Sequence, residues 1–179
     1  MKTVIKELET ERLLLRKVRK EDYLDIYNSW ASDKDVFKYL TWDAHDNPEI
    51  TKRAVNYWLN EYKKDNTYRW LVVLKESDEV IGMIDVTNKD MKYMTCEIGY
   101  TYGKKYWGYG YATEALKEVL DYLHSVGFVV VYAEHFVSNK ASGRVMEKAG
   151  MKYEATLKSR VVNKDGTRED LLVYSSIKE

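Results

Sequence analysis

Between an alternating apolar segment and a strongly amphipathic one, the chain reads Lys105-Tyr106-Trp107-Gly108-Tyr109-Gly110-Tyr111-Ala112-Thr113-Glu114-Ala115. The alternation predicts a strand before this stretch, and the amphipathic pattern predicts a helix after it. Its two glycines, one residue apart, allow backbone conformations closed to other residues and let another group approach the main chain. The first N–H groups of the following helix lack intrahelical partners and lie at the positive end of its dipole. The stretch therefore predicts a phosphate-binding loop made of backbone.

The composition is that of a folded protein without a charge bias. Hydrophobic residues make up 45% of the 179 residues, which favours one domain over residues 1–179. Twenty-nine basic residues balance 29 acidic ones, which argues against a nucleic-acid partner. The single cysteine, Cys96, has no internal disulfide partner, as expected in a reducing compartment. No apolar signal segment opens the chain and no run reaches membrane-spanning length, so we expect a cytoplasmic protein with no membrane partner.

The periodicity along the chain predicts a mixed sheet with helices on its faces, in the order β-α-α-β-β-β-α-β-α-β-β. The expected strands are residues 11–18, 68–75, 80–87, 94–102, 128–133, 153–162 and 168–176. The expected helices are residues 21–31, 48–62, 112–127 and 138–150. The strand at 128–133 is a continuous apolar run, which predicts burial on both faces. Residues 163–167 read as the turn of a hairpin.

Three kinds of glycine-rich phosphate site can be compared with the loop. A nucleotide P-loop requires a Gly-Lys pair followed by Ser or Thr, and no stretch of the chain matches it. A dinucleotide site requires Gly-x-Gly-x-x-Gly in a tight turn. Gly108 and Gly110 fit, and Glu134 ends the next strand, but Thr113 replaces the third glycine and residues 103–107 separate strand from loop. These departures disfavour a dinucleotide.

The third kind fits throughout. Lys105-x-x-Gly108-x-Gly110 resembles the acetyl-CoA pyrophosphate loop of the GNAT N-acetyltransferase superfamily, with Lys where Gln or Arg is usual. Asn139-Lys140-Ala141-Ser142, followed by Glu147-Lys148-Ala149-Gly150, resembles a signature of its RimJ/RimL-like branch, named for ribosomal-protein N-terminal acetyltransferases. The opening residues 8–16 resemble the branch's first strand, and the resemblance extends over about residues 8–176. It implies a GNAT-type fold: a mixed, mostly antiparallel central sheet flanked by about four helices.

The resemblance implies acetyl-CoA as co-substrate and assigns residues to it. In the superfamily, exposed backbone of the strand before the loop pairs with pantetheine, and an asparagine after the next strand bonds the same arm. The implied acetyl-CoA-binding residues are Tyr100, Thr101, Tyr102, Lys105, Trp107, Gly108, Tyr109, Gly110, Tyr111, Ala112 and Asn139. Asn139 is equally suited to cap the helix that follows it.

Catalytic residues are less clearly marked. Many GNAT enzymes use a tyrosine as general acid where this chain has Met146, whereas a serine in the RimL-like branch matches Ser142. Glu97, in a mostly apolar strand, is the candidate base or amine-binding group. The branch's other carboxylate is replaced by Val161. Cys96 is expected on the opposite side of the strand from Glu97, which disfavours a covalent acetyl-cysteine route.

The acceptor is expected to be a primary amine, either a protein N-terminus or a small molecule, and no metal is implied. Trp30, Tyr39 and Trp42 are candidates to line its pocket. His135 is expected to be a structural histidine with satisfied hydrogen bonds, and His45 and His124 to lie on the surface. Edge strands and exposed aromatic residues favour a homodimer. A non-catalytic acyl-CoA-binding sensor or interaction module is the alternative function.

Overall fold

A computed structural model describes residues 5–40, 42–64 and 66–178. The first four residues of the chain, where the sequence shows no apolar signal segment, lie outside the described residues. The described residues form two compact units. The first takes the chain up to Asp85 together with Tyr100–Tyr111, and the second takes Val86–Gly99 and the chain from Ala112 onward. Eight strands are hydrogen-bonded in the order β1-β2-β3-β4-β5-β6-β8-β7. All the strand pairs with a described register are antiparallel except β5 with β6, as predicted for a mixed, mostly antiparallel sheet.

The first unit is built on a short antiparallel ladder. Its strands are β1 (Leu8–Glu9), β2 (Leu13–Arg16), β3 (Arg69–Leu74) and the first part of β4 (Val80–Asp90). Leu13 and Leu15 are fully buried, as their alternation predicts. The first strand was predicted over residues 11–18, and that prediction was too long. Instead, Leu8 pairs with Leu15 across a tight turn, which adds β1.

The helix predicted over residues 21–31 is broken into three kinds of turn. A 3-10 turn (Lys20–Asp22) leads into α1 (Tyr23–Ile26), and a π-helical turn covers Tyr27–Ala31. The Ser32 N–H and hydroxyl both donate to the Tyr27 carbonyl, at 3.2 and 2.9 Å, which widens the last turn. In this segment Ile26 and Trp30 are buried, whereas Leu24 is 45% exposed.

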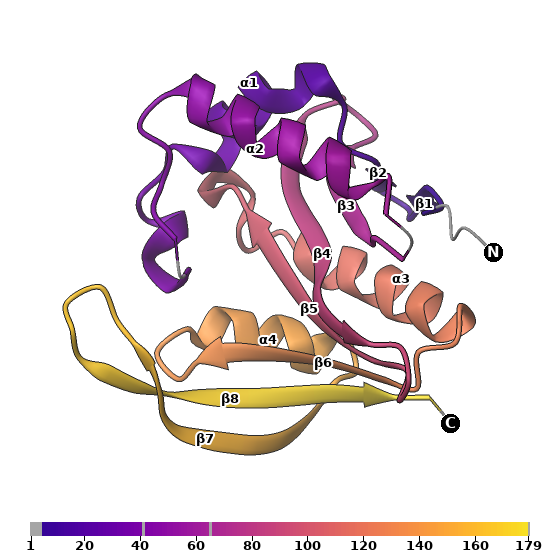
Figure 1. Cartoon of the computed structure of the whole chain (residues 1–179), viewed down its shortest axis with the longest axis vertical. Coiled ribbons are helices and arrows are strands. Elements are labelled where there is room, and N and C mark those ends of the chain that lie inside the picture. Colours follow the sequence, from indigo (N-terminus) through magenta and orange to yellow (C-terminus); the bar gives the residue numbers. More distant parts are fainter. Residues whose placement is uncertain (1–4, 41, 65, 179) are drawn as a thin grey trace. The chain divides into compact units, whose positions relative to one another are not determined.

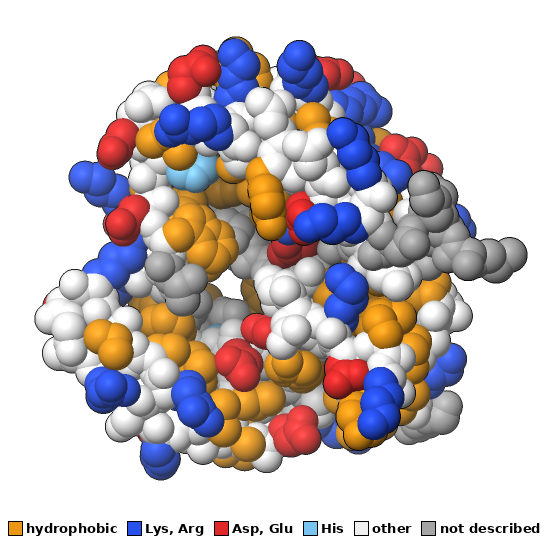
Figure 2. Space-filling view, viewed as in Figure 1, with side chains coloured by type: hydrophobic (Ala, Val, Ile, Leu, Met, Phe, Trp, Pro, Cys, Tyr) orange, Lys and Arg blue, Asp and Glu red, His pale blue; other side chains and the backbone are white. Residues whose placement is uncertain are grey.

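Helix α2 (Pro48–Glu61) agrees with the prediction. The Asn47 side chain accepts hydrogen bonds from the N–H groups of Glu49 and Ile50, and Pro48 stands in the first turn. Its buried Val55 belongs to a core with Leu71 and Val73 of β3, so α2 packs on this ladder beside α1 (Figure 1). Both Lys and Arg side chains and Asp and Glu side chains lie over the upper part of the face in Figure 2, which is the part that carries α1 and α2.

The second unit combines two helices with a long hairpin. It contains nearly all of α3 (Tyr111–Ser125), together with β6 (Val130–Phe136), α4 (Lys140–Lys148), β7 (Lys152–Val162) and β8 (Arg168–Ile177). The predicted turn is confirmed, since the Asn163 N–H donates to the Thr167 carbonyl at 2.8 Å. Strand β6 was expected to be buried on both faces, and this was wrong: Val131, Ala133 and His135 are buried, whereas the residues between them are half-buried.

Candidate active site

The glycine loop follows β5 (Thr95–Tyr102) and a single 3-10 turn, Lys104–Tyr106. Gly108 and Gly110 have φ angles of 85° and 82°, in the left-handed region that favours glycine. Among the described residues, no backbone acceptor pairs with the N–H groups of residues 108–110. Since α3 begins at Tyr111, its first N–H groups follow directly. The loop therefore presents a run of main-chain donors, as the sequence predicts.

The entry to this loop is fixed by close backbone packing. The Gly103 N–H donates to the Ile81 carbonyl at 3.0 Å, and a Cβ on Gly103 would lie 2.5 Å from the carbonyl oxygen of Ser29. Only glycine fits this space without a shift of backbone. Ser29 belongs to the π-helical turn, so the irregular end of the first helix is the surface against which the loop starts. The Trp107 indole N–H donates to the Tyr102 carbonyl at 2.8 Å and ties the loop to the end of β5.

Both lysines of the loop are paired with carboxylates from elsewhere in the first unit. Lys104 bonds Asp35, and Lys105 Nζ lies 3.0 Å from Oε1 of Glu79. The hydrogen bond to Glu79 raises the pKa of Lys105, and its partner Lys105 lowers the pKa of Glu79. Sequence reasoning assigned Lys105 to the co-substrate and did not find Glu79, because an ion pair 26 residues apart leaves no local signal.

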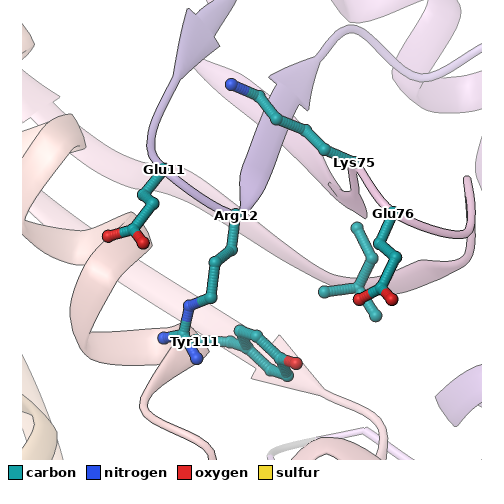
Figure 3. A pocket seen from close by; sticks show the side chains of 6 residues that line it. Glu11, Arg12, Lys75, Glu76 and Tyr111 are labelled. Atoms are coloured by element: carbon teal, nitrogen blue, oxygen red, sulfur yellow. The ribbon is translucent and has the colours of Figure 1, made fainter.

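A third basic residue, Arg12, reaches the loop from the position just before β2. Its guanidinium donates to the Tyr109 carbonyl at 3.1 Å and lies 4.5 Å from the centre of the Tyr111 ring. Arg12 and Tyr111 also line a surface pocket of about 380 Å³ with Glu11, Leu74, Lys75 and Glu76 (Figure 3). Figure 3 shows the guanidinium beside the Tyr111 ring, whereas the Lys75 ammonium points away from it.

In the second unit, Asn139 and Ser142 come together at the start of α4. The Asn139 side-chain oxygen accepts the Ser142 N–H at 3.3 Å, so Asn139 caps this helix as expected. Glu169 of β8 accepts the N–H of Ser138, and the Asn163 amide donates to the same carboxylate at 3.0 Å. Glu169 thus ties the hairpin to the residue before the cap. Sequence patterns gave no reason to single it out.

Glu97 lies half-buried on β5, in register with Tyr132 of the parallel strand β6. Burial raises the pKa of the Tyr132 hydroxyl, and the nearby carboxylates of Glu97 and Glu134 raise it further. The structure therefore groups two acids around a tyrosine whose ionisation is disfavoured. Tyr132 was missed because it reads as an ordinary apolar position of a strand.

Cys96 and the histidines take mainly structural positions. Cys96 is buried, and desolvation raises the pKa of its thiol to about 12. His45 and His124, expected on the surface, are half-buried: His45 Nδ1 lies 2.8 Å from the Thr51 hydroxyl oxygen, and the two ring nitrogens of His124 lie 2.8 and 2.9 Å from the Phe128 carbonyl and the Ser176 hydroxyl. His135 is only half satisfied, because Nδ1 meets the Phe136 carbonyl at 2.8 Å whereas buried Nε2 has no partner among the described residues.

The three acceptor candidates differ in exposure. Trp30 is 3% exposed and belongs to the core of the first unit, Tyr39 is half-buried, and Trp42 is 53% exposed with its ring edge-on to Phe37.

Within the described residues, no group of three or more His, Cys, Asp and Glu side chains is arranged to hold a metal ion. Likewise, none of their helices is both long and apolar enough to cross a membrane.

Comparison with known proteins gives a consistent family. The model of the acetyltransferase (GNAT) domain matches residues 12–152. The uncharacterized N-acetyltransferase YnaD of Bacillus subtilis (strain 168) is 31% identical over 179 aligned residues, which cover 96% of this chain and 97% of YnaD. A GNAT-family acetyltransferase structure from Bacillus anthracis is 28% identical, with a TM-score of 0.83 over 96% of this chain and 98% of that one.

A more distant structure shows the same fold. The microcin C7 self-immunity acetyltransferase MccE, in complex with acetyl-CoA and AMP, is 18% identical, with a TM-score of 0.86 over 94% of each chain. The family model spans most of this chain and YnaD aligns with nearly all of it. The chain belongs to the GNAT family of acetyltransferases, which are acyltransferase enzymes.

Proposed function

We propose that this protein transfers the acetyl group of acetyl-CoA to a primary amine by direct attack within a ternary complex. The observation that carries the proposal is the loop at residues 108–110, where two glycines are left-handed and no backbone acceptor among the described residues takes the main-chain N–H groups. A pyrophosphate fits such a loop, because its oxygens accept several N–H donors and its charge is favoured at a helix N-terminus. Acetyl-CoA carries a pyrophosphate, and the family is one of acetyltransferases.

Direct attack is favoured over a covalent enzyme intermediate by the state of the cysteine. A nucleophilic thiol must reach its thiolate form near neutral pH. Burial raises the pKa of the Cys96 thiol to about 12, so almost none of it is thiolate at pH 7 to 8. The amine nitrogen therefore attacks the thioester carbonyl itself, the C–S bond breaks, and CoA leaves as the thiolate, which takes a proton from solvent.

We assign three roles in the second unit: a general base, a hydrogen-bond donor to the leaving group and a binding residue. Glu97 accepts the proton that the attacking amine loses, because its half-buried carboxylate lies on the strand that enters the loop. Ser142 donates a hydrogen bond to the leaving sulfur, since a hydroxyl is too weak an acid to give up its proton readily. The Asn139 oxygen is engaged by the helix N–H, so its amide NH₂ is the group offered to the pantetheine arm.

The loop can be tested with two matched glycine variants. Gly110 and Gly166 have nearly the same φ angle, 82° and 85°, and a Cβ would meet no tight contact at either. Alanine at either position is expected to lower the free energy of unfolding by about 1 kcal/mol, because a side chain disfavours this backbone region. Only Gly110→Ala is expected to raise the KM for acetyl-CoA, by roughly tenfold or more. Equal KM values for both variants would remove the loop from the binding site.

The reaction and its acceptor can be tested together by measuring thiol release from acetyl-CoA. The panel contains peptides with free N-termini, polyamines and aminoglycosides, because a protein N-terminus and a small amine both remain candidate acceptors. Intersecting double-reciprocal lines, with Cys96→Ala as active as wild type, are expected for a ternary complex. Parallel lines would contradict it. CoA binding without turnover on any amine would favour a non-catalytic acyl-CoA sensor.

A further inference from the structure

Arg12 makes two contacts with the glycine loop, although 97 residues separate it from Tyr109 in the sequence. Nη1 donates to the Tyr109 carbonyl at 3.1 Å, and the guanidinium carbon lies 4.5 Å from the centre of the Tyr111 ring. The side chain also passes Gly110 closely, since a Cβ there would lie 3.6 Å from Nη2. Arg12 thus touches the loop on both sides of Gly110.

The hydrogen bond from Arg12 to the Tyr109 carbonyl also fixes the direction of the Gly110 N–H. The Tyr109 carbonyl and the Gly110 N–H belong to one planar trans peptide, so they point in opposite directions. Gly110 leaves this peptide freer to rotate than another residue would, because glycine restricts its own φ least. By holding the carbonyl, Arg12 turns the Gly110 N–H to the far side of the loop, and no backbone acceptor among the described residues takes it there.

The second contact braces the same segment. Tyr111 stacks on Tyr109, with ring centres 5.8 Å apart and an angle of 17° between the planes. Arg12 lies over Tyr111, so the Tyr111 ring contacts both the guanidinium and the Tyr109 ring. A planar guanidinium can donate in its plane while it stacks through its face, whereas a lysine ammonium has no such face.

We propose that Arg12 is a positioning residue, which holds the Tyr109–Gly110 peptide so that the Gly110 N–H is preset for the pyrophosphate of acetyl-CoA. This inference rests on the proposed function. The two arginines near the start of the chain then have different roles. Arg16 is buried and donates two 2.8 Å hydrogen bonds to the Asp22 carboxylate. Arg16 therefore stabilises the fold of the first unit, whereas Arg12 orients the glycine loop.

Lys75 provides the matched control. It lines the same pocket and carries the same charge, but its ammonium donates to the Thr10 carbonyl at 2.6 Å and pairs with Glu9. If Arg12 acted only through its positive charge near the loop, Lys75→Ala and Arg12→Ala would weaken binding to a similar degree. If it acts by holding the peptide, Lys75→Ala leaves binding within twofold of wild type.

The test combines ¹⁵N relaxation of the Gly108 and Gly110 amides with the KM for acetyl-CoA and the Kd for CoA and dephospho-CoA. In Arg12→Ala we expect the order parameter of Gly110 to fall from about 0.85 to below about 0.6. The KM should rise about tenfold, as for one lost charge-assisted hydrogen bond, with kcat within twofold and an unchanged melting temperature. Arg12→Lys should recover part of the KM and little of the order.

Three results for Arg12→Ala would overturn the proposal. An unchanged order parameter, or an unchanged KM, shows that Arg12 does not hold the loop for the ligand. A loss of affinity confined to CoA, with dephospho-CoA unaffected, shows that Arg12 binds the 3′-phosphate directly. Failure of the wild-type protein to bind CoA would refute the proposed function instead, and the relaxation of Gly110 would still decide whether Arg12 orders the loop.

Discussion

Gly143 of α4 faces the ring of His135 in β6. A Cβ on Gly143 would lie 2.6 Å from His135 Nε2 and 2.9 Å from Cε1. Gly143→Ala should therefore lower the free energy of unfolding by about 1–3 kcal/mol, as expected for an overpacked contact. Chemical denaturation measures this change.

His135→Ala provides the background that isolates this contact. With the ring removed, Gly143→Ala should be neutral or stabilising by up to about 1 kcal/mol, because alanine favours helix more than glycine does. The same loss in both backgrounds would show that His135 is not the group that restricts position 143.

The sequence predicted the role of a residue only where its contacts lie within a few positions of it in the chain. The glycines of the loop and the Asn139 cap lie within a few residues of what they contact, and the sequence indicated both. Arg12, Glu79 and Glu169 act on residues 26 to 97 positions away, and nothing in their neighbourhood marks them. The unpaired Nε2 of His135 depends in the same way on how closely α4 approaches β6.

At the scale of elements, Asn47 is the N-cap residue that fixes where α2 begins. Its side chain accepts from the N–H groups of Glu49 and Ile50 at 3.1 and 3.3 Å. Asn47→Ala should cost about 1 kcal/mol of stability, and Asn47→Asp should preserve it. Asn56→Ala, at an exposed position of the same helix, is the control and should be neutral or slightly stabilising. A loss of equal size at both positions would rule out the cap as the cause.

Periodicity predicted the long elements well and the short ones poorly. α2, α3 and the β7–β8 hairpin have enough turns or alternations for the pattern to be clear. The segment from Tyr23 to Ala31 does not, because its π-helical turn depends on a capping bond from Ser32 and on packing against Gly103. The two-residue β1 depends on pairing with β2 and has no periodicity of its own.

At the scale of the whole molecule, the protein should lose stability in alkali. Burial raises the pKa of Tyr62 from 10.0 to about 12 and that of Cys96 from 9.0 to about 12. Both groups are neutral when protonated, so the unfolded chain releases their protons at lower pH than the folded chain does. Their contribution is complete below about pH 9, and it is lost as the pH rises from about 9 to 12.

Urea denaturation at pH 8, 9.5 and 10.5 measures this decline. Cys96→Ala and Tyr62→Phe should each make the fall with pH shallower, whatever they do to stability at pH 8. The comparison is one of slopes, because the Tyr62 hydroxyl also bonds the Val18 N–H and the Arg69 carbonyl. A wild-type slope retained in both variants would assign the alkaline loss to other groups.

The family and, apart from β1, the order of strands and main helices along the chain were accessible from sequence, because two motifs in a fixed order and a regular alternation specify them. The acceptor was not, because the candidate side chains Tyr39 and Trp42 lie on an irregular segment, where periodicity carries no signal.

The donors of the glycine loop are main-chain N–H groups, and this makes the loop tolerant of evolutionary change. Every residue type except proline carries the same donor, so substitution at Tyr109 or Tyr111 alters the bracing of the loop but not its inventory of donors. Exchange of the flanking side chains should therefore change how firmly the loop is held while the donors themselves remain. The positions where substitution should cost most are Gly108 and Gly110, because their left-handed backbone sets the shape in which those donors are presented.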